Sequence, residues 1–295
     1  MTTNSITSSQ RKQVVRFMED GLDALTLDKD GAQRIIENGG EFQVGLKELI
    51  QKHSVTNQFA DEEVESSYTY PKEYRGPKQI VDQIKAIAEI FGLDPSNALE
   101  FAKNLPELPN GAEGWFAIPT VDAVAAKHFP EVTDPADRYC RAVELVLEKI
   151  GKSRKFYNYR EGEITPNRLR QHARTLHALG QIGETQKGDI LIVPAQYGMR
   201  HRGRSVRRAR EVFVAGEFGL GAFAVGCMAL THPDRYVRWE ELDTDCAGDE
   251  FAPDADGDFS VAPFFRFSDG EVRFSANNVS VPGDSYGSAS GFLSQ

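Results

Sequence analysis

Residues 189–194 read DILIVP and residues 220–230 read LGAFAVGCMAL, and these two apolar stretches decide the fold class. The first is short, rich in β-branched residues and ends at a proline, which indicates a buried strand. The second is apolar around its whole circumference, which indicates a buried helix, because a surface helix has a polar face. A buried strand and a buried helix in one chain predict a mixed α+β core.

Toward the C terminus, short aromatic segments replace the helical patterns. Phe264–Phe267 and Val272–Phe274 flank a Ser-Asp-Gly turn, which is typical of a β-hairpin. Ser288–Leu293 ends on two large apolar residues, and we expect it to be a docked terminal strand. The last third of the chain is therefore expected to be rich in strands and loops.

Toward the N terminus, apolar residues recur at helical spacing within 14–25, 35–49, 80–91 and 135–150, and a further helix is expected over 166–179. The stretch LPELPNGAEG at residues 105–114 contains two prolines and two glycines and indicates a domain boundary. We therefore expect an α+β protein with a helical N-terminal domain, residues 1–108, followed by a mixed domain, residues 109–295, with a β-rich C-terminal end.

Composition excludes several classes of protein. The 295 residues contain no apolar run long enough for a membrane helix, and the opening MTTNSITSSQRKQ lacks the pattern of a secretory signal. A cytoplasmic location is the default, although display at the cell surface by another route stays open. The three cysteines, Cys140, Cys227 and Cys246, form no CxxC pair, which argues against a disulfide framework and a zinc site.

The segment Arg200–Arg210, RHRGRSVRRAR, contains six arginines and no acid. If the part after Gly203 is helical, Arg204, Arg207 and Arg208 share one face and could bind successive phosphates of a nucleic acid. The net charge of −10 opposes such binding. The alternative is that these arginines pair with acids of the C-terminal region, namely Asp243, Asp245, Asp249, Glu250, Asp254, Asp256 and Asp258.

Two acidic groups are candidate metal sites. Asp254, Asp256 and Asp258 resemble the start of a calcium loop but lack the glycine and the final acid of an EF-hand, so a different Ca²⁺ or Mg²⁺ site competes with a solvated turn. The group Asp245, Asp249 and Glu250 is the candidate centre of a metal-assisted enzyme. The sequence has no recognised catalytic motif, and we do not expect an enzyme or a required cofactor.

The C-terminal stretch 274–294, FSANNVSVPGDSYGSASGFLS, contains no Lys, Glu, Gln, Met or Trp. It is not charged like a disordered tail, and it closes on Phe292 and Leu293, which favours docking against a core. Residues 275–286 would then form a surface loop that is fixed at both ends.

Four stretches carry a family resemblance: FGLGAFAVGCMALTHPDRY at 218–236, WEELDTDCAGDEF at 239–251, APFFRF at 262–267 and the closing YGSASGF at 286–292. They resemble bacterial proteins in which a near-constant YGSASGF ending follows a changeable stretch, similar to the variable proteins of diversity-generating retroelements. That resemblance, which covers about residues 110–295, implies a C-type-lectin-like (formylglycine-generating-enzyme-like) fold.

The resemblance also implies a function. The retroelement rewrites adenines, and a mutagenised AAY codon never encodes Lys, Glu, Gln, Met or Trp, which agrees with the composition of residues 277–286. Small polar residues and tyrosine on a rigid scaffold suit a variable binding surface for a protein or another macromolecule. The expected ligand-binding residues are Asn277, Asn278, Val279, Ser280, Val281, Pro282, Asp284, Ser285 and Tyr286. Oligomerisation stays open.

Overall fold

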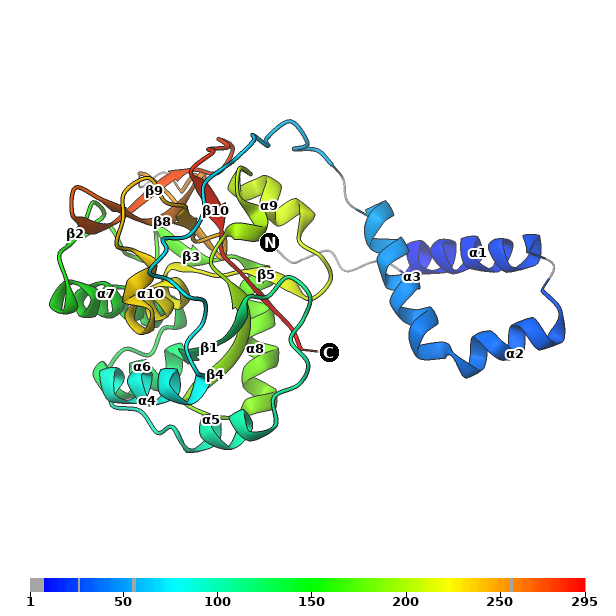
Figure 1. Cartoon of the computed structure of the whole chain (residues 1–295), viewed down its shortest axis with the longest axis horizontal. Helices are drawn as coiled ribbons and strands as arrows, with labels where there is room; N and C mark the ends of the chain where they lie inside the picture. Colours follow the sequence, from blue (N-terminus) through cyan, green and yellow to red (C-terminus); the bar gives the residue numbers. More distant parts are fainter. Residues whose placement is uncertain (1–7, 26, 55–56, 255–256, 295) are drawn as a thin grey trace. The chain divides into compact units, whose positions relative to one another are not determined.

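The computed structural model describes residues 8–25, 27–54, 57–254 and 257–294 (Figure 1). The chain divides into two compact units, residues 1–56 and residues 57–295. The expected boundary at residue 108 falls inside the second unit. In the described parts of the chain, no helix is both long and apolar enough to cross a lipid bilayer.

The first unit contains α1 (Ser8–Ala24), α2 (Lys29–Glu37) and α3 (Gly39–Ser54). Asp28 caps α2 by accepting a hydrogen bond from the Gly31 N–H at 2.6 Å. Asn38 separates α2 from α3, so the apolar pattern expected over 35–49 is divided between two helices. No described residue of α2 is buried, so its apolar Ile36 is exposed.

The helices of the second unit match most of the expected patterns. They are α4 (Ile80–Phe91), α5 (Ser96–Phe101), α6 (Val121–His128), α7 (Pro135–Ser153), α8 (Ala173–Gln186), α9 (Val206–Val212) and α10 (Ala222–Thr231), with short 3-10 turns η1 (Ala102–Asn104), η2 (Met199–His201) and η3 (Pro233–Arg235). The helix expected over 166–179 begins only at Ala173, because Leu169–Gln171 forms a strand instead.

The strands form two sheets. The four-stranded sheet has the order β1-β4-β11-β5 and contains β1 (Gly114–Pro119), β4 (Ile190–Gln196), β11 (Ser290–Phe292) and β5 (Glu217–Gly219). The seven-stranded sheet contains β2 (Phe156–Asn158), β3 (Leu169–Gln171), β6 (Asp243–Asp245), β7 (Asp249–Phe251), β8 (Val261–Ser268), β9 (Glu271–Asn278) and β10 (Tyr286–Ser288). This mixed architecture with a β-rich C-terminal end confirms the α+β fold class.

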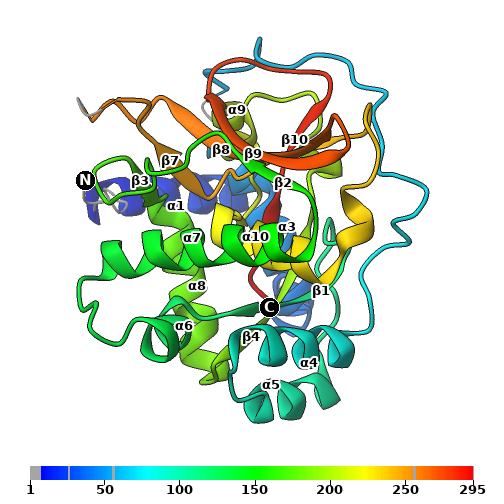
Figure 2. The same cartoon turned by 90° about the vertical axis from the view of Figure 1, so that its left-hand side faces the viewer.

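The two apolar stretches that predicted the core lie at its centre. All seven residues of β4 are buried, and β4 pairs with β1 in antiparallel register, with Trp115 opposite Pro194. Helix α10 is buried on all sides and packs against α7, as Figure 2 shows. The predicted hairpin is formed by β8 and β9, whose turn residues Asp269 and Gly270 both have positive φ. That backbone twist matches the twist of the paired strands.

Candidate binding surface

The closing residues of the chain are docked in the interior, as expected from the sequence. Strand β11 lies between β4 and β5, and β10 pairs in parallel with β6. Gln196 donates from Nε2 to the Ser288 carbonyl and to the Ser290 hydroxyl, at 2.9 Å each. Ser290 in turn donates to the buried carboxylate of Glu217 at 2.7 Å. Buried side-chain hydrogen bonds therefore hold the end of the chain in place.

Glu217 is the centre of this anchor. Its Oε1 lies 2.6 Å from Nε2 of the buried His201 and 3.3 Å from Nε of Arg200. Burial raises the pKa of Glu217, but the hydrogen bonds from His201 and Ser290 and the charge of Arg200 together bring it below the ordinary value. Burial lowers the pKa of His201. The carboxylate is therefore ionised and serves to anchor β11.

The nine expected ligand-binding residues lie together in one surface segment, residues 277–286, which runs from the last two residues of β9 to the first residue of β10. The side chains of Asn277, Asn278, Val281 and Asp284 are exposed, and Val281 keeps 55% of its surface accessible. The others, Val279, Ser280, Pro282, Ser285 and Tyr286, are half-buried. We call residues 277–286 the rim segment.

The backbone of the rim segment is tied down although its side chains face outward. The carbonyl of Val279 accepts from the Arg207 N–H at 3.1 Å, and that of Ser285 accepts from the Asp243 N–H at 2.7 Å. The carbonyl of Asp284 accepts from the Ser66 hydroxyl. A fixed main chain with accessible side chains is the arrangement that a binding surface requires.

A cavity of about 230 Å³ adjoins the rim segment. It is lined by Tyr68, Trp239, Glu240, Glu241, Asp243, Arg266, Phe267, Ser268, Ser285 and Tyr286. We call it the rim pocket. The Trp239 side chain is 71% exposed, and the Tyr286 ring is supported by an edge contact with Phe264 at 5.4 Å between centroids. The pocket has no continuous pattern in the sequence, because its residues come from four separate stretches of chain.

Two of the three carboxyl groups of the rim pocket, those of Asp243 and Glu241, are partly desolvated. Burial raises the pKa of Asp243 to about 7, although Arg266 and Arg235 oppose the shift. Burial also raises the pKa of Glu241. The pocket therefore contains carboxyl groups whose negative charge the protein itself compensates only in part.

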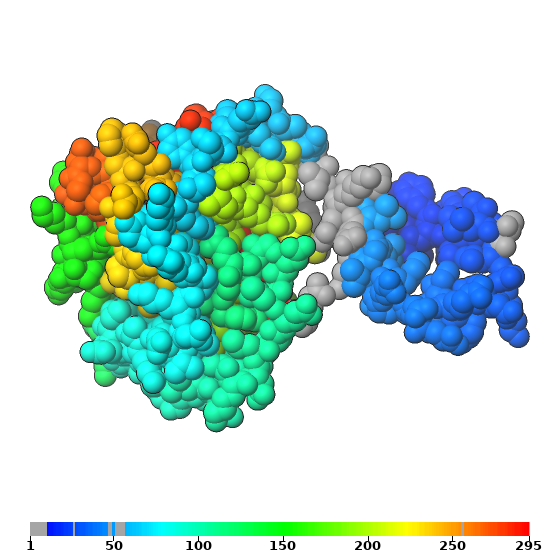
Figure 3. All heavy atoms as spheres, in the orientation of Figure 1, coloured from blue at the N-terminus to red at the C-terminus, as the bar shows by residue number. Residues whose placement is uncertain are grey.

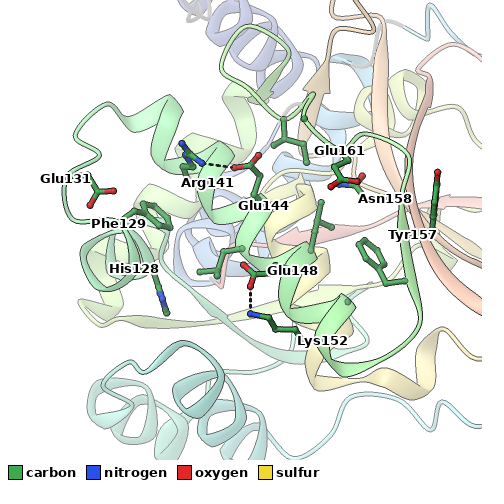
Figure 4. A pocket seen from close by; sticks show the side chains of 16 residues that line it. His128, Phe129, Glu131, Arg141, Glu144, Glu148, Lys152, Tyr157, Asn158 and Glu161 are labelled. Atoms are coloured by element: carbon green, nitrogen blue, oxygen red, sulfur yellow. Dashed lines mark hydrogen bonds and ion pairs between the residues drawn. The ribbon is translucent and has the colours of Figure 1, made fainter.

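A larger groove of about 860 Å³ lies elsewhere on the second unit, between α6, α7 and the chain around β2 (Figure 4). Two ion pairs stand on its wall, Arg141 with Glu144 at 3.4 Å and Lys152 with Glu148. The two charges of each pair compensate each other. The groove therefore offers a ligand fewer uncompensated charges than the number of charged residues in its lining suggests.

The arginines of the segment 200–210 are largely paired. Four of the six contact carboxylates: Arg200 with Glu217, Arg204 with Glu63, Arg207 with Glu62, and Arg208 with Glu63 and Glu211. Arg210 donates to the carbonyls of Ala247 and Asp249. The structure thus pairs the arginines within the chain. Four of them contact acids outside the expected set, whereas Arg210 interacts electrostatically with three expected acids, Asp245, Asp249 and Glu250.

Two of the four acids that contact these arginines, Glu62 and Glu63, lie in the stretch 57–66 and pair with Arg204, Arg207 and Arg208. In Figure 3 this stretch lies against the surface of the segment that contains α9. The Glu62 backbone also accepts from the Ser205 N–H at 3.1 Å, and the Val64 N–H donates to Gly203 at 2.8 Å. A long-range contact of this kind leaves no local pattern in the sequence, which explains why the partners were not predicted.

Of the two candidate metal groups, the structure describes only Asp245, Asp249 and Glu250 completely. Among the described residues, no three His, Cys, Asp or Glu side chains are placed to hold a metal ion. Asp254 and Asp258 are exposed, and Asp256 lies outside the described residues. Asp245, Asp249 and Glu250 are likewise not placed to share an ion, and Glu250 pairs with Arg170 at 2.7 Å.

Asp249 instead has a structural role. Its Oδ1 accepts from the Tyr139 hydroxyl and its Oδ2 from the Ala222 N–H, each at 2.6 Å, so it caps the buried helix α10. Burial raises the pKa of Asp249 to about 7, and that of Asp245 to about 8. Cys246 is buried beside these acids, and burial raises the pKa of its thiol, which disfavours a reactive thiolate.

Comparison of the chain with protein-family models, with curated proteins and with solved structures gave no match.

Proposed function

We propose that this chain is a ligand-binding protein of the variable class, in which a retroelement diversifies the rim segment so that it binds a protein or another macromolecule. In this proposal residues 109–295 form the C-type-lectin-like module that the sequence resembles. The observation that carries the proposal is the contrast within the last 20 or so residues, where outward-facing side chains are followed directly by a buried terminal strand.

The geometry supports this function because a diversified surface must tolerate substitution without loss of the fold. Asn277, Asn278, Val281 and Asp284 are exposed, and exposed substitutions usually change stability by no more than about 0.5 kcal/mol. The Asn278 carboxamide accepts from the Ser280 N–H at 2.9 Å and helps to shape the turn. The main chain of the segment is also bound to Arg207, Asp243 and Ser66, so its path does not depend on the side chains of Val281 and Asp284. New side chains would therefore change what the surface binds while the scaffold stays the same.

The residue types also support binding by this surface. Asn and Ser adapt their hydrogen bonds to different partners, and Tyr286 offers a large contact area at low entropic cost. The arginine pairs around Glu62 and Glu63 weaken the nucleic-acid alternative, since those guanidinium groups already have anionic partners. The separated acids weaken the metal-assisted enzyme in the same way.

The decisive experiment is to sequence the DNA around the gene in several isolates. We expect a nearby copy of the 3′ end that differs from the gene only where the copy has adenine, together with a reverse transcriptase gene. The differences should fall in codons for residues 277–286. An invariant 3′ end without such a copy would refute diversification.

A second experiment tests tolerance at the protein level. We expect Val281→Ala and Asp284→Ala to leave the free energy of unfolding within about 0.5 kcal/mol of the parent chain, because both side chains are exposed. The matched anchor variant Ser290→Ala should lower it by about 1–2 kcal/mol, because it leaves the buried Glu217 with one hydrogen bond fewer. Equal losses at rim and anchor positions would contradict a tolerant surface.

A further inference from the structure

We propose that the rim pocket binds a basic side chain, lysine or arginine, projecting from the protein ligand. The proposal rests on the proposed function, since Ser285 and Tyr286 of the rim segment form part of the pocket wall. The pocket combines an exposed aromatic ring with an excess of carboxyl groups in a volume of about 230 Å³, which is enough for the end of one long side chain.

The aromatic part of the pocket suits a cation. Trp239 keeps 71% of its side-chain surface accessible although it lines a cavity. A lysine ammonium or arginine guanidinium over an indole ring is attracted by the negative face of the ring. An exposed tryptophan at the mouth of a polar pocket is also the residue type that most often dominates a protein interface.

The charges of the pocket point to a basic occupant. Its lining contains three carboxyl groups, Glu240, Glu241 and Asp243, and one cation, Arg266. The nearby Arg238 does not compensate them, because it forms a bidentate pair with Glu73 at 2.8 and 2.9 Å from its Nε. The buried Arg235 acts on both Glu241 and Asp243, but together with Arg266 it provides two cations against three carboxyl groups. A cation entering the pocket would compensate carboxylates that are now partly desolvated, and it would gain from the low local dielectric.

The floor of the pocket is rigid, which favours recognition of a defined group. The Asp243 N–H donates to Ser285, and the Leu242 N–H donates to Thr69 at 3.0 Å. The Leu242 carbonyl accepts from Nη2 of Arg235 at 2.6 Å, and the guanidinium of Arg235 is buried over the ring of Tyr70 at 4.3 Å. A basic side chain would therefore meet a preorganised set of acceptors and lose little free energy to ordering them.

The test uses the full chain and three blocked tripeptides, in which the central residue is lysine, acetyl-lysine or glutamate between two glycines. The indole emission of Trp239 reports on occupancy, and a Trp239→Phe variant gives the background from Trp115. We expect a saturable change in emission with the lysine peptide only. A change of the same size with the acetyl-lysine or glutamate peptide would overturn the proposal, as would the absence of any change with lysine.

Variants that each remove one carboxyl group test whether the lysine peptide binds in the rim pocket. Asp243→Asn and Glu241→Gln should each weaken binding of the lysine peptide about tenfold, since each removes one carboxylate facing the cation. The control Glu131→Gln removes an equally negative, exposed acid that does not line the rim pocket, and it should change affinity little. If Glu131→Gln weakens binding as much as the pocket variants, the attraction comes from net charge and the proposal fails.

Failure of the rim-pocket proposal can be distinguished from failure of the proposed function. A diversified gene together with no response to the lysine peptide would refute the pocket and leave the rim segment as the binding surface. Selective lysine binding together with an invariant gene would support the pocket and refute diversification.

Discussion

The substitution Gly287→Ala tests how the rim segment is anchored, because Gly287 is the point at which the exposed segment enters the interior. A Cβ at this position would lie 2.9 Å from the carbonyl carbon of Gly198 and closer still to its oxygen. Ordinary contacts between carbon atoms are about 3.5–4.0 Å, so one of the two backbones must move by about 0.6–1 Å. Gly198 has a φ of 132°, which favours glycine and leaves it little freedom to adjust.

The expected loss of stability comes from the steric overlap and from the hydrogen bonds on either side of it. Overpacking of a well-filled interior costs about 1–3 kcal/mol. The displacement also weakens the hydrogen bonds from the Gly203 N–H to Tyr286 and from Gln196 to Ser288, both 2.9 Å, which contribute about 1 kcal/mol each. We therefore expect the free energy of unfolding to fall by about 2–4 kcal/mol, with a loss of about 5–10 °C in Tm for a unit of this size.

The assay is urea unfolding followed by circular dichroism, with thermal melts in parallel. The control is Gly180→Ala in α8, where an added Cβ meets no atom within 4 Å and should stabilise the helix by about 0.5–1 kcal/mol. If Gly287→Ala unfolds at the urea concentration of the parent chain, the backbones at residues 198 and 287 do not pack as described and the reasoning is refuted.

Three further predictions concern other parts of the second unit. Tyr139→Phe removes the hydroxyl that donates to Asp249 at 2.6 Å, and it should lower the free energy of unfolding by about 1–2 kcal/mol in urea; an unchanged value would contradict the capping role. The pKa of Asp245 is raised to about 8, so its contribution to stability is present at low pH and is lost as pH rises through 8. The free energy of unfolding of the parent chain should therefore fall between about pH 6 and about pH 9, and in Asp245→Asn this fall should be about 2 kcal/mol smaller. Urea titrations in which the variant shows the same dependence on pH as the parent chain would contradict the prediction. Arg207→Ala removes the cation that pairs with Glu62, so limited proteolysis near residues 57–66 should accelerate severalfold, whereas unchanged cleavage would show that the pair does not hold this segment.

The sequence predicted those elements whose environment is the same on every side or alternates regularly. The strand at 190–196 and the helix at 222–231 are buried all round, so their composition alone identifies them. The β8–β9 hairpin was predicted because its turn has a local chemical signature in Asp269 and Gly270. Residues close together in the sequence determine these elements, so a short stretch of sequence is enough to predict each of them.

Elements that depend on distant partners were not predicted. Residues 169–171 continue a helical pattern in the sequence, yet they pair with β7, with Leu169 opposite Phe251. His172 then caps α8, its Nδ1 accepting from the Arg174 N–H at 3.3 Å. The partners of the arginines at 204–208 were missed for the same reason, since Glu62 and Glu63 are about 140 residues away in the chain. Tertiary pairing overrides local propensity in such segments.

The candidate site likewise has one part that the sequence predicts and one part that it does not. The rim segment is continuous in sequence, and its unusual composition made it visible. The rim pocket is not, because Tyr68, Trp239 and Arg266 meet only after β6, β8 and β10 have paired. An exposed tryptophan in a polar stretch is the one signal that could have drawn attention to it.

The packing of the closing strand explains why a variable segment would have to end at Tyr286. The five residues that follow are Gly, Ser, Ala, Ser and Gly, and all of them are buried. An added Cβ at Gly291 would lie 2.8 Å from the ring of Phe218, just as one at Gly287 would collide with Gly198. Any larger side chain there must displace either backbone or a core aromatic residue, at a cost of about 1–3 kcal/mol per position. Diversification that continued past Tyr286 would therefore destabilise the scaffold on which the binding surface depends, whereas diversification at exposed positions before it, such as Val281 and Asp284, would change mainly what the surface contacts.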